Sequence, residues 1–208
     1  MKDVDSGLRD IAEIRSIMER STKFLSLSGF AGIGAGAIAL VGAWAAWEMF
    51  TADGIVLNYD ATVADLQPDT RISLVLLGVV VLALALVIAW FFSRRLIRRH
   101  AEPVNGTVMR QLVLSFAVPI LVGAILTLLL FYHGPLWPVV PSMLLFYGLG
   151  LFSAGSFTFG EVRTLGMIEI LLGLAAALLP EFGLYFWAAG FGVFHIVYGL
   201  LFFRKYHQ

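Results

Sequence analysis

Long apolar stretches dominate the chain and alternate with short polar segments. Each stretch is close to the roughly 20 residues that an α-helix needs to cross about 30 Å of hydrocarbon. Because lipid cannot satisfy exposed backbone groups, such stretches form helices, whereas β-strands would appear as shorter alternating runs. The pattern predicts an all-α polytopic membrane protein with six transmembrane helices in residues 24–208. The six predicted spans are 25–49, 72–92, 111–132, 136–154, 164–180 and 182–203.

The composition supports a membrane class over a soluble one. Hydrophobic residues make up 60% of the 208 residues and charged residues 13%, whereas about 25% are charged in an average soluble domain. A soluble all-α protein with buried core helices is the alternative. It would need polar helix faces, which the second and third stretches lack. The lipid bilayer is therefore the expected surrounding of this chain.

The charges between the stretches predict an orientation. Basic residues precede the first stretch, follow the second, fourth and sixth, and are nearly absent from the other connections, where Arg71 stands alone among acidic residues. By the positive-inside rule both termini lie in the cytoplasm. We expect a multi-pass protein of the bacterial inner membrane. The basic residues are Lys2, Arg9, Arg15, Arg20, Lys23, Arg94, Arg95, Arg98, Arg99, Arg110, Arg163, Arg204 and Lys205, and the acidic ones are Asp53, Asp60, Asp65, Asp69 and Glu181.

The polar segment before the first span predicts an amphipathic cytoplasmic helix within residues 1–23. Residues 5–22 place Leu8, Ile11 and Met18 on one stripe, and the acidic residues balance the basic ones. A helix of this kind lacks the Lys/Arg excess that binds anionic lipid. We expect it to pack on the bundle, on a second copy of the chain, or on a cytoplasmic protein partner.

Residues 14–36, IRSIMERSTKFLSLSGFAGIGAG, resemble the start of a group of uncharacterised bacterial six-helix inner-membrane proteins. The resemblance covers mainly the first span and its cytoplasmic lead-in. It implies a multi-pass inner-membrane protein and carries no known activity, cofactor or functional residue.

The sequence offers little support for catalysis or for cofactor binding. The chain has no cysteine, which excludes thiol chemistry and Cys-based metal sites. We find no HExxH, GxSxG or phosphate-loop motif and no histidine cluster with metal spacing. The basic segment 94–100 lies at a helix end, where it is typical of a topology signal and not of a nucleic-acid site. We expect a non-enzymatic protein without cofactor or metal.

Small residues mark the helix faces expected to pack closely. Between helices in lipid, close approach of the backbones replaces the hydrophobic effect as the driving force. Ser28, Gly32 and Gly36 share one face of the first span, which suits either the centre of the bundle or a homodimer seam. Similar faces contain Gly173 on the fifth span and Gly192 and Gly199 on the sixth.

Two ionisable residues lie well inside the predicted spans, Glu169 in the fifth and His195 in the sixth. Each shares a helical face with small residues and therefore points into the protein. A turn near residues 181–182 would bring the two side chains to similar depth. Tyr198, one turn from His195, could extend a network that titrates as a unit.

Such a pair suits a proton-linked or small-solute transporter or channel, since ionisable groups within spans commonly mark transport paths. The structural alternative is a hydrogen bond that joins two helices and has no further role. The functional alternative is a non-enzymatic sensor or accessory subunit that acts through the N-terminal helix. An internal duplication of the last two hairpins is also plausible, because Tyr147-Gly148-Leu149 matches Tyr198-Gly199-Leu200.

Overall fold

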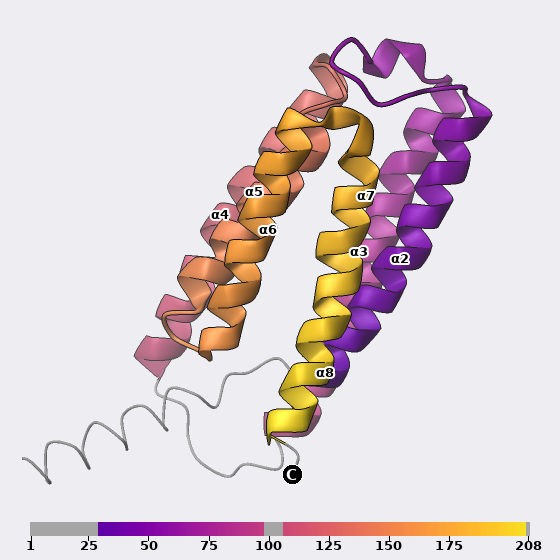
Figure 1. Cartoon of the computed structure of the whole chain (residues 1–208). Coiled ribbons are helices and arrows are strands. Elements are labelled where there is room, and N and C mark those ends of the chain that lie inside the picture. The colour runs from indigo at the N-terminus through magenta and orange to yellow at the C-terminus, as the bar shows by residue number, and fades with distance from the viewer. Residues whose placement is uncertain (1–28, 98–105, 207–208) are drawn as a thin grey trace, which may run out of the picture.

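The computed structural model describes residues 29–97 and 106–206, and these residues are almost entirely helical (Figure 1). They contain no strand, and a single isolated β-bridge joins Thr62 to Pro135. The prediction of an all-α fold is confirmed for this part of the chain. The helices are α2 (Gly29–Ala52), η1 (Val63–Asp65), α3 (Pro68–Ile97), α4 (Gly106–His133), α5 (Val139–Ala154), α6 (Gly160–Leu178), η2 (Pro180–Phe182), α7 (Gly183–Trp187), η3 (Ala188–Phe194) and α8 (His195–Tyr206).

Some predictions fall outside the described residues. The amphipathic helix at residues 5–22, the whole segment 1–23, and Ser28 lie there, and so do residues 98–100 of the basic segment 94–100. Their structure stays a prediction.

Four helical segments are long and apolar enough to cross a membrane: Gly29–Ala52, Pro68–Phe92, Met109–His133 and Pro180–Lys205. The apolar helix α5 is shorter, with 16 residues, and α6 contains the charged residues Glu161, Arg163 and Glu169 in its 19. The most apolar part of α3 has no buried residue. Exposing an apolar surface of that extent to water would be strongly unfavourable, so these helices indicate a membrane-embedded protein.

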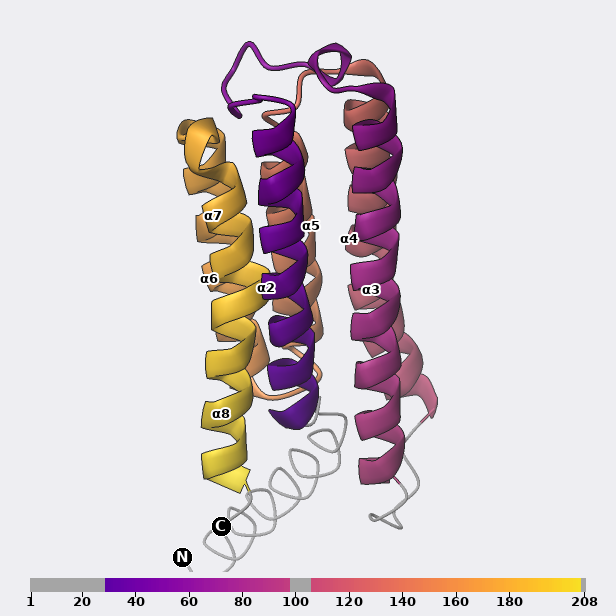
Figure 2. The ribbon, with the colours of Figure 1, turned by 90° about the vertical axis from the view of Figure 1, so that its right-hand side faces the viewer.

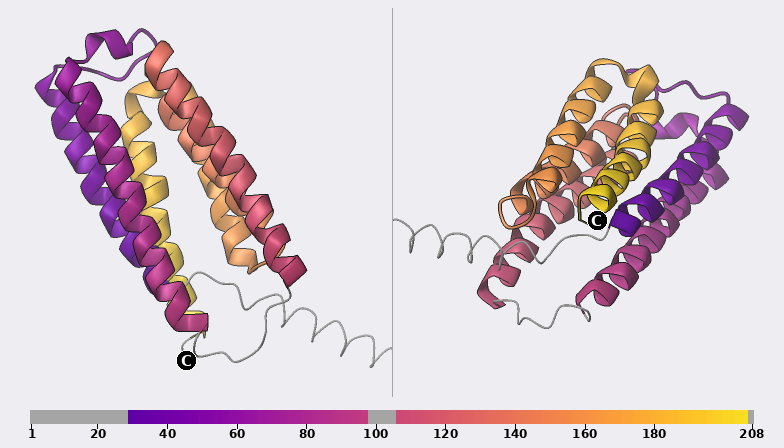
Figure 3. Two further views of the ribbon diagram at one scale, coloured as in Figure 1. Left: turned by 180° about the vertical axis from the view of Figure 1, so that it is seen from behind. Right: turned by 60° about the horizontal axis from the view of Figure 1, so that its bottom comes forward.

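The helices form two groups of three. In one group α4 and α6 both pack against α5, and in the other α3 and α8 both pack against α2. The two groups approach each other near residues 53–67 and diverge toward the opposite end (Figures 1 and 3). Figure 2 shows α2 between α8 and α3, so the first described helix is central to its group.

Glycines set the closest helix contacts. A Cβ placed on Gly36 would lie 2.6 Å from the carbonyl oxygen of Gly192, and one on Gly32 would lie 3.0 Å from that of His195. The small-residue face of α2 is therefore occupied by η3 and α8 of the same chain. A homodimer through this helix would have to use another of its faces.

The repeated Tyr-Gly-Leu sequence reflects two similar helix crossings. Gly148 of α5 lies against Gly166 and Ile170 of α6, and Gly199 of α8 lies in the same way against Gly29 and Ile33 of α2. The hairpins that contain these tripeptides nevertheless pack differently. Helices α4 and α5 contact each other closely, whereas α6 meets α8 at few points.

Residues 53–67 form a cap over one end of the bundle. Ala61 and Leu66 are buried together with Leu136 of the α4–α5 connection, and the Leu136 backbone N–H donates to the Ala61 carbonyl at 2.8 Å. The Tyr59 hydroxyl bonds to the carbonyls of residues 177 and 178 at the end of α6, at 3.0 and 3.1 Å. The cap thus ties both helix groups together at this end.

Hydrogen bonds also fix the cap internally. The Arg71 Nε donates to the Leu66 carbonyl at 2.9 Å, and the Asp65 carboxylate accepts from the backbone and the hydroxyl of Thr62 at 2.7 and 2.9 Å. These two bonds lower the pKa of Asp65 below its usual range. The opposite end of the bundle, here called the basic end, contains Arg94, Arg110, Arg163, Arg204 and Lys205.

Candidate functional site

The structure brings Glu169 and His195 together. Glu169 lies on the small-residue face of α6 and is fully buried, with 0% of its surface exposed, and His195 is 5% exposed. The Nδ1 of His195 lies 3.4 Å from Oε1 of Glu169. The turn after α6 therefore brings the two ionisable groups to the same depth and into contact.

His195 has a hydrogen-bond partner on each ring nitrogen. Its Nδ1 is 2.9 Å from the carbonyl oxygen of Gly190, and its Nε2 is 2.8 Å from the hydroxyl of Tyr147. A carbonyl oxygen only accepts, so Nδ1 carries a proton, and in the neutral ring Nε2 accepts from the Tyr147 hydroxyl. The imidazole is thus held in one tautomer and one orientation without help from Glu169.

Tyr147 of α5 is the site residue that the sequence reasoning missed. Its ring also packs against Phe191 and His195, with centroid distances of 4.9 and 5.4 Å. Tyr147 precedes Gly148, whose contact with Gly166 sets how closely α5 approaches α6. The match between the two Tyr-Gly-Leu tripeptides was the one available signal, and it pointed to Tyr198 and Tyr147 as equivalent positions.

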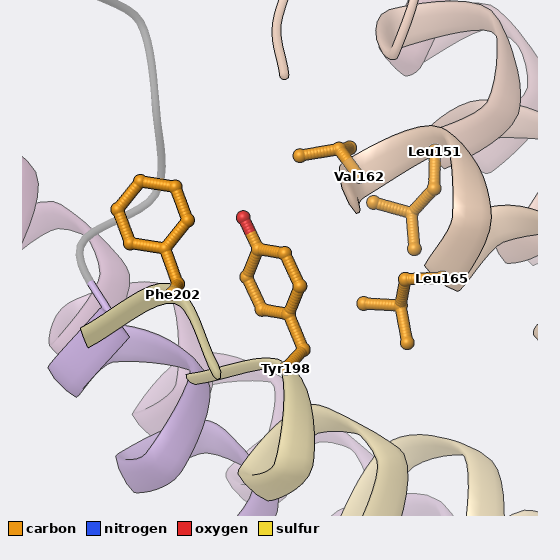
Figure 4. Close-up of a cluster of buried hydrophobic side chains, with 5 residues drawn as sticks. All are labelled: Leu151, Val162, Leu165, Tyr198 and Phe202. Atoms are coloured by element: carbon orange, nitrogen blue, oxygen red, sulfur yellow. The ribbon is translucent and has the colours of Figure 1, made fainter. Parts of the chain in front are cut away.

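Tyr198, the third predicted residue of the site, lies one helical turn from His195 on α8. It is buried in an apolar cluster with Phe202 of α8, Leu151 of α5, and Val162 and Leu165 of α6. Figure 4 shows these side chains between the two helix groups. The hydroxyl that reaches His195 is that of Tyr147, while Tyr198 lies one helical turn closer to the basic end.

The Glu169 carboxyl makes no hydrogen bond within the described residues, although both of its oxygens are buried. It packs against the bare backbone of Gly190, where an added Cβ would collide with Oε2 and would lie 2.8 Å from Leu144 Cδ2. Buried carboxyl groups almost always have such partners. A buried carboxyl group without a hydrogen bond lowers the stability of the fold, which favours a functional role for Glu169.

A π-helical segment passes directly beside this carboxyl. The sequence predicts one regular helix over 182–203, but residues 188–194 (η3) form a wider π-helix between α7 and α8. Gly190 and Gly192 in this segment allow the close approach of Glu169 and of Leu40. Single π-helical turns inside α-helices occur frequently at functional sites.

The remaining predicted glycines serve helix packing. Gly173 of α6 faces Leu145 of α5, with an added Cβ 2.8 Å from its Cγ. Gly32, Gly36, Gly192 and Gly199 lie at the α2–α8 and α2–η3 contacts. They position α8, and through it His195, relative to the rest of the bundle.

The Glu169–His195 pair can hold a proton in two ways without net charge. Either the carboxyl group keeps the proton beside a neutral imidazole, or the carboxylate faces an imidazolium. An uncompensated charge in this buried place would be costly, so we expect the two groups to titrate as a coupled unit. Because Nδ1 already carries a proton, the added proton of an imidazolium would lie on Nε2, beside the Tyr147 hydroxyl. The described residues contain no group of three His, Asp or Glu side chains that could hold a metal ion.

Comparisons with protein-family models, with curated proteins and with solved structures found no match to this chain. The function must therefore be argued from the fold and from the Glu169–His195 pair.

Proposed function

We propose that the protein crosses the bacterial inner membrane six times, with both termini in the cytoplasm. Helices α5 and α6, which pack along each other, would complete the six spans with the four long apolar segments. The basic end, at which α8 ends, would face the cytoplasm. The cap, with Asp53, Asp60 and Asp65, would lie on the outer side.

The absence of native cysteine makes this topology straightforward to test. A membrane-impermeant thiol reagent added to intact cells should label the Asp60→Cys variant and leave the Arg204→Cys variant unlabelled until the cells are opened. The reverse pattern would invert the orientation. Labelling of both variants in intact cells would contradict the odd number of spans, five, that the topology places between them.

We further propose that the protein is a proton-linked transporter or channel for a small solute or for protons themselves, with Glu169 and His195 as the proton-carrying pair. One observation carries this proposal: a fully buried carboxyl group lies 3.4 Å from an imidazole nitrogen and accepts no hydrogen bond. A pair retained for helix packing would be expected to form that bond. Glu169 and His195 also lie on helices of different groups, α6 and α8. A movement of one helix group relative to the other would therefore change the contact between the two side chains.

Flux measurements in liposomes test the function. Wild-type protein should relax an imposed pH gradient, alone or with one member of a panel of small solutes, and the Glu169→Gln variant should lose most of this flux. Tyr132→Phe, on an exposed α4 side chain, is a control and should behave like the wild type. If wild-type liposomes are inert to pH gradients and to the whole solute panel, the proposal is wrong.

The sensor or accessory-subunit function stays a second prediction. It depends on residues 5–22, which lie outside the described part of the chain. Deleting residues 1–20 should abolish recovery of a cytoplasmic partner if this function is correct.

A further inference from the structure

One seam between the helix groups leads from the basic end to the Glu169 carboxyl. On α6, Glu161, Leu165 and Glu169 follow each other at intervals of four residues and therefore share a helical face. On α8, His195, Tyr198 and Phe202 form the facing stripe, and Lys205 continues it. The seam is thus lined by α6 on one side and by α8 on the other.

The seam contains three layers. At the basic end Lys205 Nζ pairs with Glu161 Oε1, and their side chains are 62% and 30% exposed. Next comes the apolar cluster, in which Leu165, Tyr198 and Phe202 are nearly closed off from solvent (Figure 4). The third layer is the Glu169–His195 pair, one turn further along α6.

The two helix groups are joined by different kinds of contact at the two ends of the bundle. At the cap, backbone and hydroxyl hydrogen bonds connect residues 53–67 to both α6 and the α4–α5 connection. At the basic end, the contacts between α6 and α8 include the solvent-exposed ion pair and apolar side chains, with few close backbone approaches. Exposed ion pairs contribute little to stability. Contacts of this kind open at a lower free-energy cost than the backbone hydrogen bonds of the cap.

We infer that the α6–α8 seam is the access path of the Glu169–His195 site. The seam opens at the basic end, with the Glu161–Lys205 ion pair as its latch and the cluster around Leu165 as its apolar plug. The inference rests on the proposed function, because it assigns the side from which protons reach the site. The cap stays closed while the seam opens.

Single-cysteine variants in the cysteine-free chain test this path. The Leu165→Cys variant places a thiol in the plug, and Ala176→Cys places one on α6 beyond Glu169 toward the cap, at a position with 0% exposure. Both are exposed to an impermeant thiol reagent in sealed vesicles of either orientation, with and without Lys205→Gln. If Leu165→Cys does not fold, Val162→Cys in the same cluster replaces it.

The plug thiol should react from the basic end, and Lys205→Gln should raise its rate about twofold to fivefold, which corresponds to the loss of an exposed ion pair. Exchanging the two charges, Glu161→Lys with Lys205→Glu, should restore the slow rate. The Ala176→Cys variant should react at the same rate in both backgrounds. Reaction of the plug thiol from the capped side, or no acceleration without the ion pair, would overturn the inference. Labelling of the thiol does not depend on flux. If the plug thiol reacts as expected but the protein transports nothing, the proposed function is wrong and the access path stands.

Discussion

Replacing Gly199 by valine is expected to separate α8 from α2 and to lower the stability of the protein by about 3 kcal/mol. A Cβ at Gly199 would collide with the carbonyl oxygen of Gly29 and would lie 2.8 Å from both the backbone nitrogen and the Cγ1 of Ile33. Backbone atoms in a helix cannot rotate away as a long side chain can. The helices would have to move apart, and the van der Waals contact that holds them in lipid would be lost.

The matched control is Gly78→Val on α3, where an added Cβ meets nothing within 4 Å. Both substitutions introduce the same β-branched residue into a helix, so intrinsic helix propensity is held constant. The apparent melting temperature in detergent should fall strongly for Gly199→Val and little for Gly78→Val. Equal losses would show that Gly199 is not at a close helix contact.

Replacing Glu169 by methionine is expected to leave the protein as stable as the wild type or to stabilise it by about 1 kcal/mol or more. Buried charged groups exchanged for apolar ones of similar volume often behave in this way. His195 would not be left unsatisfied, because Gly190 and Tyr147 still supply its two hydrogen bonds. The flexible methionine side chain suits the irregular space beside Gly190.

His195→Ala should have the opposite effect on stability. It leaves the Tyr147 hydroxyl and the Gly190 carbonyl without the ring nitrogens that they contact, at a cost of about 1–3 kcal/mol for an unsatisfied buried group. Thermal unfolding of both variants in one detergent measures the difference. If Glu169→Met destabilises the protein as much as His195→Ala does, Glu169 has a structural role.

The sequence predicted the long apolar helices of the described residues and the main contact of the site. Apolar length predicts the long helices, because the bilayer sets a minimum span. Glu169 and His195 could be paired because both share faces with glycines and alanines and because a tight turn fixes their relative depth. These arguments use only local periodicity and one short connection.

Other features depend on packing between distant helices and were not predictable in this way. Tyr147 reaches His195 from α5, 48 residues away, and nothing local indicates that α5 lies there. The π-helical segment at residues 188–194 arises where Gly190 and Gly192 meet Glu169 and Leu40. Gly36 indicates a close helix contact, but the sequence does not show whether the partner helix belongs to the same chain or to a second copy.

The most direct test of the account is to measure flux and thermal stability on the same preparation of Glu169→Gln in liposomes. Flux should be lost while the melting temperature stays within the range of the wild type, because the carboxyl carries protons and makes no stabilising hydrogen bond. A variant that retains flux, or whose flux falls only in proportion to the loss of folded protein, would contradict it.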